Sequence, residues 1–134
     1  MSKKSGFTII EILVVLGVVI AMAIAVLPVG SNYFALGRNS SSKTGVATLA
    51  TAISQYKFEI GEYPLNLNSL TVSNGQYGPY ISSTALKDSW NQNYNYSYND
   101  NSFAVWSNGP DKKNNSGGGV PTAFQGDDIG VIGH

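Results

Sequence analysis

Hydrophobic and polar positions divide the chain into two unequal parts. Residues 7–27 are almost continuously apolar, whereas residues 61–134 are rich in asparagine, serine, glycine and tyrosine. An apolar run of about 20 residues has the length of a membrane-spanning helix. Lys3 and Lys4 precede the run, and the positive-inside rule keeps such an N-terminus in the cytoplasm. The pattern predicts one hydrophobic anchor joined to a polar head.

A second helical pattern follows the anchor. Pro28 ends the apolar run, and proline tends to kink or break a helix. The glycines and serines of residues 30–45 give weak helix propensity, so this segment is either helix or flexible linker. Gly61 is placed to cap the end of the next helix, with Pro64 beyond it as a stop. Before that cap, apolar residues recur at helical spacing and predict a face packed under the head: Val46, Leu49, Ile53, Tyr56 and Ile60.

The pattern of residues 94–107 predicts a β-hairpin. Tyr94, Tyr96 and Tyr98 alternate with polar residues, a turn-like segment follows, and a second apolar run ends at residue 107. This tyrosine ladder is open to two interpretations, a carbohydrate-binding face or packing within the sheet. Packing is favoured, because aromatic residues suit strands and cross-strand pairs. With the long helix, the hairpin makes the predicted fold class α+β.

Composition removes several classes of function. The chain has 134 residues, the length of one small domain, and its 8 basic and 8 acidic groups balance, which argues against a nucleic-acid binder. It has no cysteine, and its single histidine is His134, so the usual parts of hydrolase triads and histidine-rich metal sites are missing. Asp127 and Asp128 make a poor glycosidase pair, since sequence neighbours rarely straddle a bond. We predict that the protein is not an enzyme.

Glu11 is the one charged residue inside the apolar run. A carboxylate in hydrocarbon costs about 2.5–3.5 kcal/mol on insertion scales, so such a group usually has a partner or a function. Its own span offers no cation to pair with it. A secretory signal cleaved near residues 21–25 and a plain transmembrane anchor are the two simplest alternatives, and Glu11 is anomalous in both.

The residues around Glu11 carry a family signature. After a short basic leader, residues 6–11 read Gly-Phe-Thr-Ile-Ile-Glu. This segment resembles the class III signal of type IV prepilins and type II secretion pseudopilins. The resemblance implies that a prepilin peptidase cleaves after Gly6 and methylates the new amine of Phe7. It also implies that Glu11 neutralises the N-terminal amine of a neighbouring subunit, and physical chemistry agrees, because a buried charge is tolerable when paired.

The rest of the chain extends the resemblance. Residues 55–64 read Gln-Tyr-Lys-Phe-Glu-Ile-Gly-Glu-Tyr-Pro and residues 88–91 read Asp-Ser-Trp-Asn. Both resemble the major pseudopilins of the type II secretion G subunit, although a proline and a glycine common in the second motif are lost here. The resemblance covers nearly the whole chain.

Carboxylates gather in two short loops near the C-terminus. Asp111 follows Gly-Pro, and Asp127 and Asp128 follow Gly126. Ca²⁺ takes six to eight hard oxygen ligands and mixes carboxylates with carbonyls, but an Asp-Asp pair in a solvated tail is common, and the chemistry alone favours that interpretation. The loops resemble the calcium loop of the same pseudopilins. The resemblance implies Ca²⁺ bound by Asp111, Asp127, Asp128 and the backbone oxygen of Asn108.

Two departures from the family pattern concern these loops. Lys112 stands where the family often has glycine, and residues 120–125 form an uncharged insertion before Gly126. The insertion raises the question of whether the shape of the loop is kept.

The resemblance implies a type IV pilin-like fold, in which a long N-terminal helix with an apolar first half packs on a small antiparallel sheet with a C-terminal calcium loop. We expect these segments: a prepilin leader at 1–6, a transmembrane and filament-core helix at 7–28, a linker and the amphipathic second half of the helix at 29–61, and a β-rich head at 62–134.

The expected function is that of a structural pseudopilus subunit, which polymerises after leader cleavage and acts in type II-like protein secretion. The alternatives are a type IV pilin for adhesion, motility or DNA uptake, and a membrane-tethered, calcium-dependent glycan-binding module. The implied partners are copies of the chain, prepilin peptidase, an inner-membrane assembly platform and minor pseudopilins. The implied location is a single pass through the bacterial inner membrane with the head outside the cytoplasm, and later a periplasmic or cell-surface filament.

Overall fold

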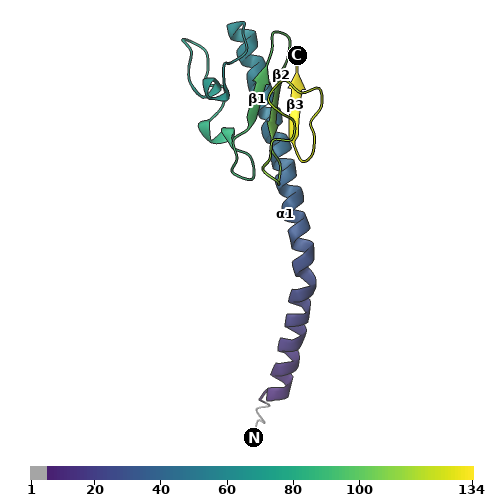
Figure 1. Ribbon diagram of the computed structural model, residues 1–134. Helices are drawn as coiled ribbons and strands as arrows, with labels where there is room; N and C mark the ends of the chain where they lie inside the picture. Colours follow the sequence, from purple (N-terminus) through teal and green to yellow (C-terminus); the bar gives the residue numbers. More distant parts are fainter. Residues whose placement is uncertain (1–5) are drawn as a thin grey trace. The chain divides into compact units, whose positions relative to one another are not determined.

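The computed structural model describes residues 6–134, including their side chains except at positions 26–31 (Figure 1). Most of the leader, residues 1–5, lies outside the described residues. The chain forms two compact units, Met1–Leu36 and Gly37–His134, called here the N-terminal unit and the head. Helix α1 (Ile9–Ile60) contributes its first turns to one unit and its last turns to the other.

Helix α1 is continuous where the sequence left a break or a linker open. It passes through Pro28 and through the glycine- and serine-rich segment 30–45. The break that Pro28 could have caused is absent. The helix continues although a proline removes one intrahelical hydrogen bond. The helix ends as predicted, because Gly61 takes φ +94° and donates its N–H to the carbonyl of Lys57 at 2.8 Å.

Besides the last turns of α1, the head contains a three-stranded antiparallel sheet in the order β1-β2-β3 (Figure 1). Strands β1 (Asn95–Tyr98) and β2 (Phe103–Ser107) form the predicted hairpin, with Tyr98 paired to Phe103. Strand β3 (Ile129–Gly133) was not predicted, because glycine at two of its five positions hides the alternating pattern. It pairs with β2 and brings the C-terminal segment to the sheet.

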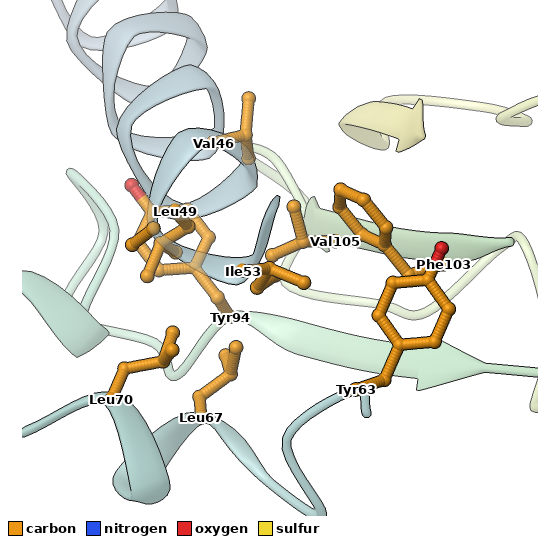
Figure 2. Packing of buried hydrophobic residues seen from close by; sticks show 10 residues of the cluster. Val46, Leu49, Ile53, Tyr63, Leu67, Leu70, Tyr94, Phe103 and Val105 are labelled. Atoms are coloured by element: carbon orange, nitrogen blue, oxygen red, sulfur yellow. The ribbon is translucent and has the colours of Figure 1, made fainter. Parts of the chain in front are cut away.

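The core of the head lies between α1 and the sheet. The predicted apolar face is confirmed for Val46, Leu49 and Ile53, which are at most 2% exposed. Its other two residues, Tyr56 and Ile60, are half-buried. Two short 3₁₀ helices, η1 (Leu67–Thr71) and η2 (Ser83–Leu86), also contribute apolar residues to this core. Burying each large aliphatic side chain contributes about 1.5–3 kcal/mol. Figure 2 shows the residues that the rest of the head contributes to this cluster: Tyr63, Leu67, Leu70, Tyr94, Phe103 and Val105.

The tyrosine ladder lies partly in this core. The side chain of Tyr94 is buried, and Tyr96 stacks on Tyr98 with ring centroids 5.5 Å apart. Tyr63 packs beside Tyr98 at 6.0 Å and beside Phe103 at 5.5 Å. Packing within the core therefore accounts for Tyr94 and in part for Tyr96, whereas Tyr98 at the end of β1 stays 39% exposed.

A close approach between Tyr94 and the helix explains one residue of poor helix propensity. A Cβ at Gly45 would collide with the Tyr94 hydroxyl, whereas nothing lies within 4 Å of a Cβ at Gly37. We expect Gly45→Ala to lower the free energy of unfolding by about 1–3 kcal/mol through overpacking. Gly37→Ala, the matched control, should be neutral or stabilising by up to about 1 kcal/mol. Denaturant unfolding of the full chain in detergent, followed through Trp90 and Trp106, measures both; equal effects would contradict the packing argument.

Candidate functional site

The first candidate site is the apolar surface of the N-terminal unit. Every large apolar side chain described between Ile9 and Ile24 keeps 51–80% of its surface exposed, and Phe7 keeps 79%. Among the residues that the structure describes, no helix combines the length and the apolar character of a membrane crossing. An exposed apolar surface of this extent marks a site of contact with lipid or protein.

Glu11 lies within this apolar surface. It is exposed in the first turn of α1, where a carboxylate is favoured by the helix dipole. Together with Phe7, Ile12, Val15 and Leu16 it lines one open groove. Gly6 and Phe7 are exposed and precede the helix, so the predicted cleavage bond lies in non-helical chain. The predicted cleavage site and the charged residue thus lie at the same end of the N-terminal unit.

The second candidate site is formed by the acidic loops, defined as residues 108–116 and 125–128. Asp111 accepts the backbone N–H of Lys113 at 2.9 Å and the side-chain amide of Asn115 at 3.2 Å. The Lys113 N–H first, and the Asn115 amide second, hold the pKa of the Asp111 carboxyl below its ordinary value. The backbone N–H of Asn115 donates to Asp128 at 3.0 Å. Asn115 therefore joins the two loops that sequence analysis brought together.

Asp128 has one satisfied and one unsatisfied oxygen. Its Oδ2 also accepts the hydroxyl of Ser116 at 2.6 Å, whereas its Oδ1 is buried without a hydrogen-bond partner among the described residues. Buried polar atoms are nearly always paired, so this oxygen would suit a hydrogen-bond donor or a cation. Asp127 lies against Gly109, which takes φ +68° and has no room for a Cβ beside the Asp127 carbonyl.

Asn108, the remaining predicted ligand, and Lys112, which replaces the family's usual glycine, lie in the first acidic loop. The side-chain oxygen of Asn108 accepts the amide of Asn95 at 2.5 Å, which fixes the residue before Gly109. Lys112 has φ +59°, in the left-handed region that favours glycine, which explains why glycine suits this position. Within the described part of the chain, however, no three Asp, Glu, His or Cys side chains form one group that can hold a metal.

The insertion at 120–125 is anchored to the sheet. The ring of Phe124 packs on Trp106 with centroids 6.1 Å apart, and a Cβ at Gly130 would collide with Phe124. The N–H of Gln125 donates to the Ser116 hydroxyl at 3.1 Å. The insertion thus covers part of β2 and supports the acidic loops.

Sequence analysis did not identify Asn115 and Ser116 as site residues. Both bind Asp128, and Asn115 also binds Asp111. The segment Asn114-Asn115-Ser116 is one of several Asn-x-Ser triplets in an asparagine- and serine-rich chain. Nothing local distinguishes it, so only its place between the two loops reveals its role.

Fold and surface together define a class of protein. A long helix, exposed and apolar at its start, whose last turns pack on a small antiparallel sheet is the architecture of type IV pilin-like subunits. Residues 32–122, more than half of the chain, match the family of type II secretion system (T2SS) protein G. The chain belongs to this family, whose members are structural components of membrane-associated secretion machinery and not a family of enzymes.

The match has clear limits along the chain. It includes Asn108 and Asp111, but it begins after Glu11 and ends before Asp127 and Asp128. Comparison with curated proteins and with solved structures gave no match.

Proposed function

We propose that the chain is the repeating subunit of a pseudopilus, a filament that polymerises after leader cleavage and acts in protein secretion. One observation supports this most directly: a member of the T2SS protein G family carries a continuous apolar surface on the first turns of α1. A subunit that works alone in water would not keep such a surface. A bundle of identical helices covers it with further copies of itself.

The driving force for the bundle depends on what it is compared with. Against water, covering apolar surface contributes about 25 cal/mol per Å². Against lipid the same surface gains little, because hydrocarbon is already apolar. Extraction from the membrane therefore has to be driven, and the assembly platform of the inner membrane is the proposed source of that work.

Charge sets the axial register in this proposal. Cleavage after Gly6 creates an ammonium at Phe7, four residues before Glu11 and in the same apolar groove. A neighbouring subunit's Glu11 would pair with this ammonium inside the bundle. A buried ion pair is a weak source of stability, but it fixes register, because each mismatched alignment leaves two charges unpaired.

Location and partners follow from the same scheme. Residues 7–28 would anchor the newly made chain in the inner membrane, with the two lysines before the anchor in the cytoplasm and the head outside. Prepilin peptidase, the assembly platform and minor pseudopilins are the proposed partners, and no catalytic role is assigned to the chain.

We also infer a calcium ion at the acidic loops. The unpaired Oδ1 of Asp128 and the close approach of Asp127 to Gly109 support the fit. Asp111, Asp127, Asp128 and the backbone oxygen of Asn108 are the proposed ligands. The described carboxylates do not form one group of three, so the ion would have to draw the two loops together, and carbonyl oxygens would complete the set. When bound, the ion would neutralise the carboxylates and tie the two loops together.

The N-terminus of the mature protein tests the proposed function directly. Intact-mass analysis and N-terminal sequencing of membrane-extracted protein should show Phe7 as the first residue, with a methylated amine, and electron microscopy should show filaments. Gly6→Val is the matched change, because it alters only the residue before the cleaved bond and should leave the leader attached. An N-terminus near residues 21–25 would instead indicate an ordinary secretory signal and contradict the proposal.

A further inference from the structure

A buried carboxylate in the head has no part in the functions proposed above. Asp88 is 8% exposed, and its contacts are made with neutral donors. Its Oδ1 accepts the backbone N–H of Trp90 at 3.0 Å and of Gln92 at 2.8 Å. These two bonds close the turn at residues 88–92, so one oxygen is enough for local structure.

The second oxygen of Asp88 points to another part of the fold. Its Oδ2 accepts the hydroxyl of Ser107, at the end of β2, at 2.5 Å. Ser107 is completely buried, and its Oγ accepts the N–H of Gly109 at 3.1 Å. One hydroxyl therefore connects Asp88 to the first residues of the acidic loops.

Gly109 in turn lies against the backbone of Asp127. It lies so close to the Asp127 carbonyl that a Cβ at this position would collide with it. The position of the Gly109 backbone therefore fixes how near the second acidic loop can lie to the first. A continuous series of contacts runs from Asp88 through Ser107 and Gly109 to Asp127.

Physical chemistry gives a reason for retaining this arrangement. A buried carboxylate is costly, and a turn can be closed by a neutral side chain or by backbone groups alone. An anion with a spare oxygen, however, orients a hydroxyl firmly, because charge-assisted hydrogen bonds are short and strong. Side chains that orient a metal site from behind its ligands commonly change its affinity by large factors.

We propose that Asp88 and Ser107 are a positioning pair that sets the spacing of the two acidic loops for a divalent cation. The pair touches no ligand and acts through Gly109 on Asp127. This inference rests on the calcium site proposed above, and the experiment separates the two.

Calcium titration by calorimetry on the full chain in detergent tests the pair. Ser107→Ala should raise the Kd for Ca²⁺ about 10- to 100-fold. Ser42→Ala is the matched control, because Ser42 is equally buried but binds Ser89, and it should leave the Kd unchanged. Asp88→Asn, which keeps an oxygen for the turn, should weaken binding by an intermediate factor, and it carries the test if Ser107→Ala does not fold. An unchanged Kd in both variants would overturn the positioning role and leave the calcium site standing.

Hydrogen exchange measured without added metal keeps the inference testable if the wild-type chain binds no Ca²⁺. In that case the calcium proposal fails, but the contacts from Ser107 to Asp127 still make a prediction. Exchange at residues 108–111 and 126–128 should quicken in Ser107→Ala and not in Ser42→Ala. Equal exchange in both variants would overturn the positioning role, since a general loss of stability affects the whole head alike.

Discussion

Replacing Glu11 by alanine is expected to abolish filament formation while the head stays folded. The change would leave the Phe7 ammonium of the neighbouring subunit without its partner in an apolar bundle. Removing one member of a buried pair costs about 3–5 kcal/mol, which lowers an association constant by two to more than three orders of magnitude. Glu11 belongs to the N-terminal unit, whereas the buried core belongs to the head, so folding of the head should not change.

Electron microscopy of cells or membranes that assemble the wild-type filament measures this effect. Glu11→Gln removes only the charge and should behave like Glu11→Ala, whereas Glu11→Asp keeps the charge and should recover part of assembly. Glu62→Ala, a change of the same type at an exposed head position, serves as the control. Normal filaments from Glu11→Ala would remove the ion pair from the proposal while leaving family and fold unaffected.

Sequence patterns predicted the elements whose signals are local. The spacing of Val46, Leu49 and Ile53 gave the buried helix face, and the alternating tyrosines gave the hairpin. Segment 30–45 remained ambiguous, because intrinsic propensity counts Gly45 against a helix. The structure shows the compensation: the Tyr94 hydroxyl occupies the space that a Cβ at Gly45 would fill, so tertiary packing requires the residue that propensity disfavours.

The candidate sites were predictable only in part, for a related reason. Asp111, Asp127 and Asp128 were predicted as ligands because carboxylates near glycines are recognisable in a sequence and resemble the family's calcium loop, and this role stays a prediction. Their supporting residues were not, since Asn115 and Phe124 are ordinary until the chain folds back on itself. Strand β3 determines that return by pairing with β2 from Phe103↔Gly133 to Ser107↔Ile129, and its two glycines concealed it.

The second large effect concerns calcium, because adding EDTA to the full chain in detergent should lower the melting temperature of the head. A ligand that binds only the native state stabilises it by RT ln(1 + [L]/Kd), or about 2.7 kcal/mol at a hundredfold excess over Kd. For a domain of this size, each kcal/mol of unfolding free energy shifts the melting temperature by about 4–8 °C, so EDTA should lower it by roughly 10 °C or more. Tryptophan fluorescence reports it, since the indole N–H of Trp106 donates to Asn114 in the first acidic loop at 3.2 Å.

Matched variants decide whether the acidic loops cause this difference. Asp127→Ala should erase it, because the variant loses a proposed ligand, whereas Asp100→Ala, an exposed aspartate in the hairpin turn, should keep it. Mg²⁺ should substitute poorly, since it demands tighter octahedral geometry than a loop rich in carbonyls provides. If the wild-type head melts at one temperature with Ca²⁺ and with EDTA, the aspartates are a solvated acidic surface. In that case the contacts of Asn115 and Phe124, together with the pairing of β3 to β2, hold the C-terminal segment in place without a metal.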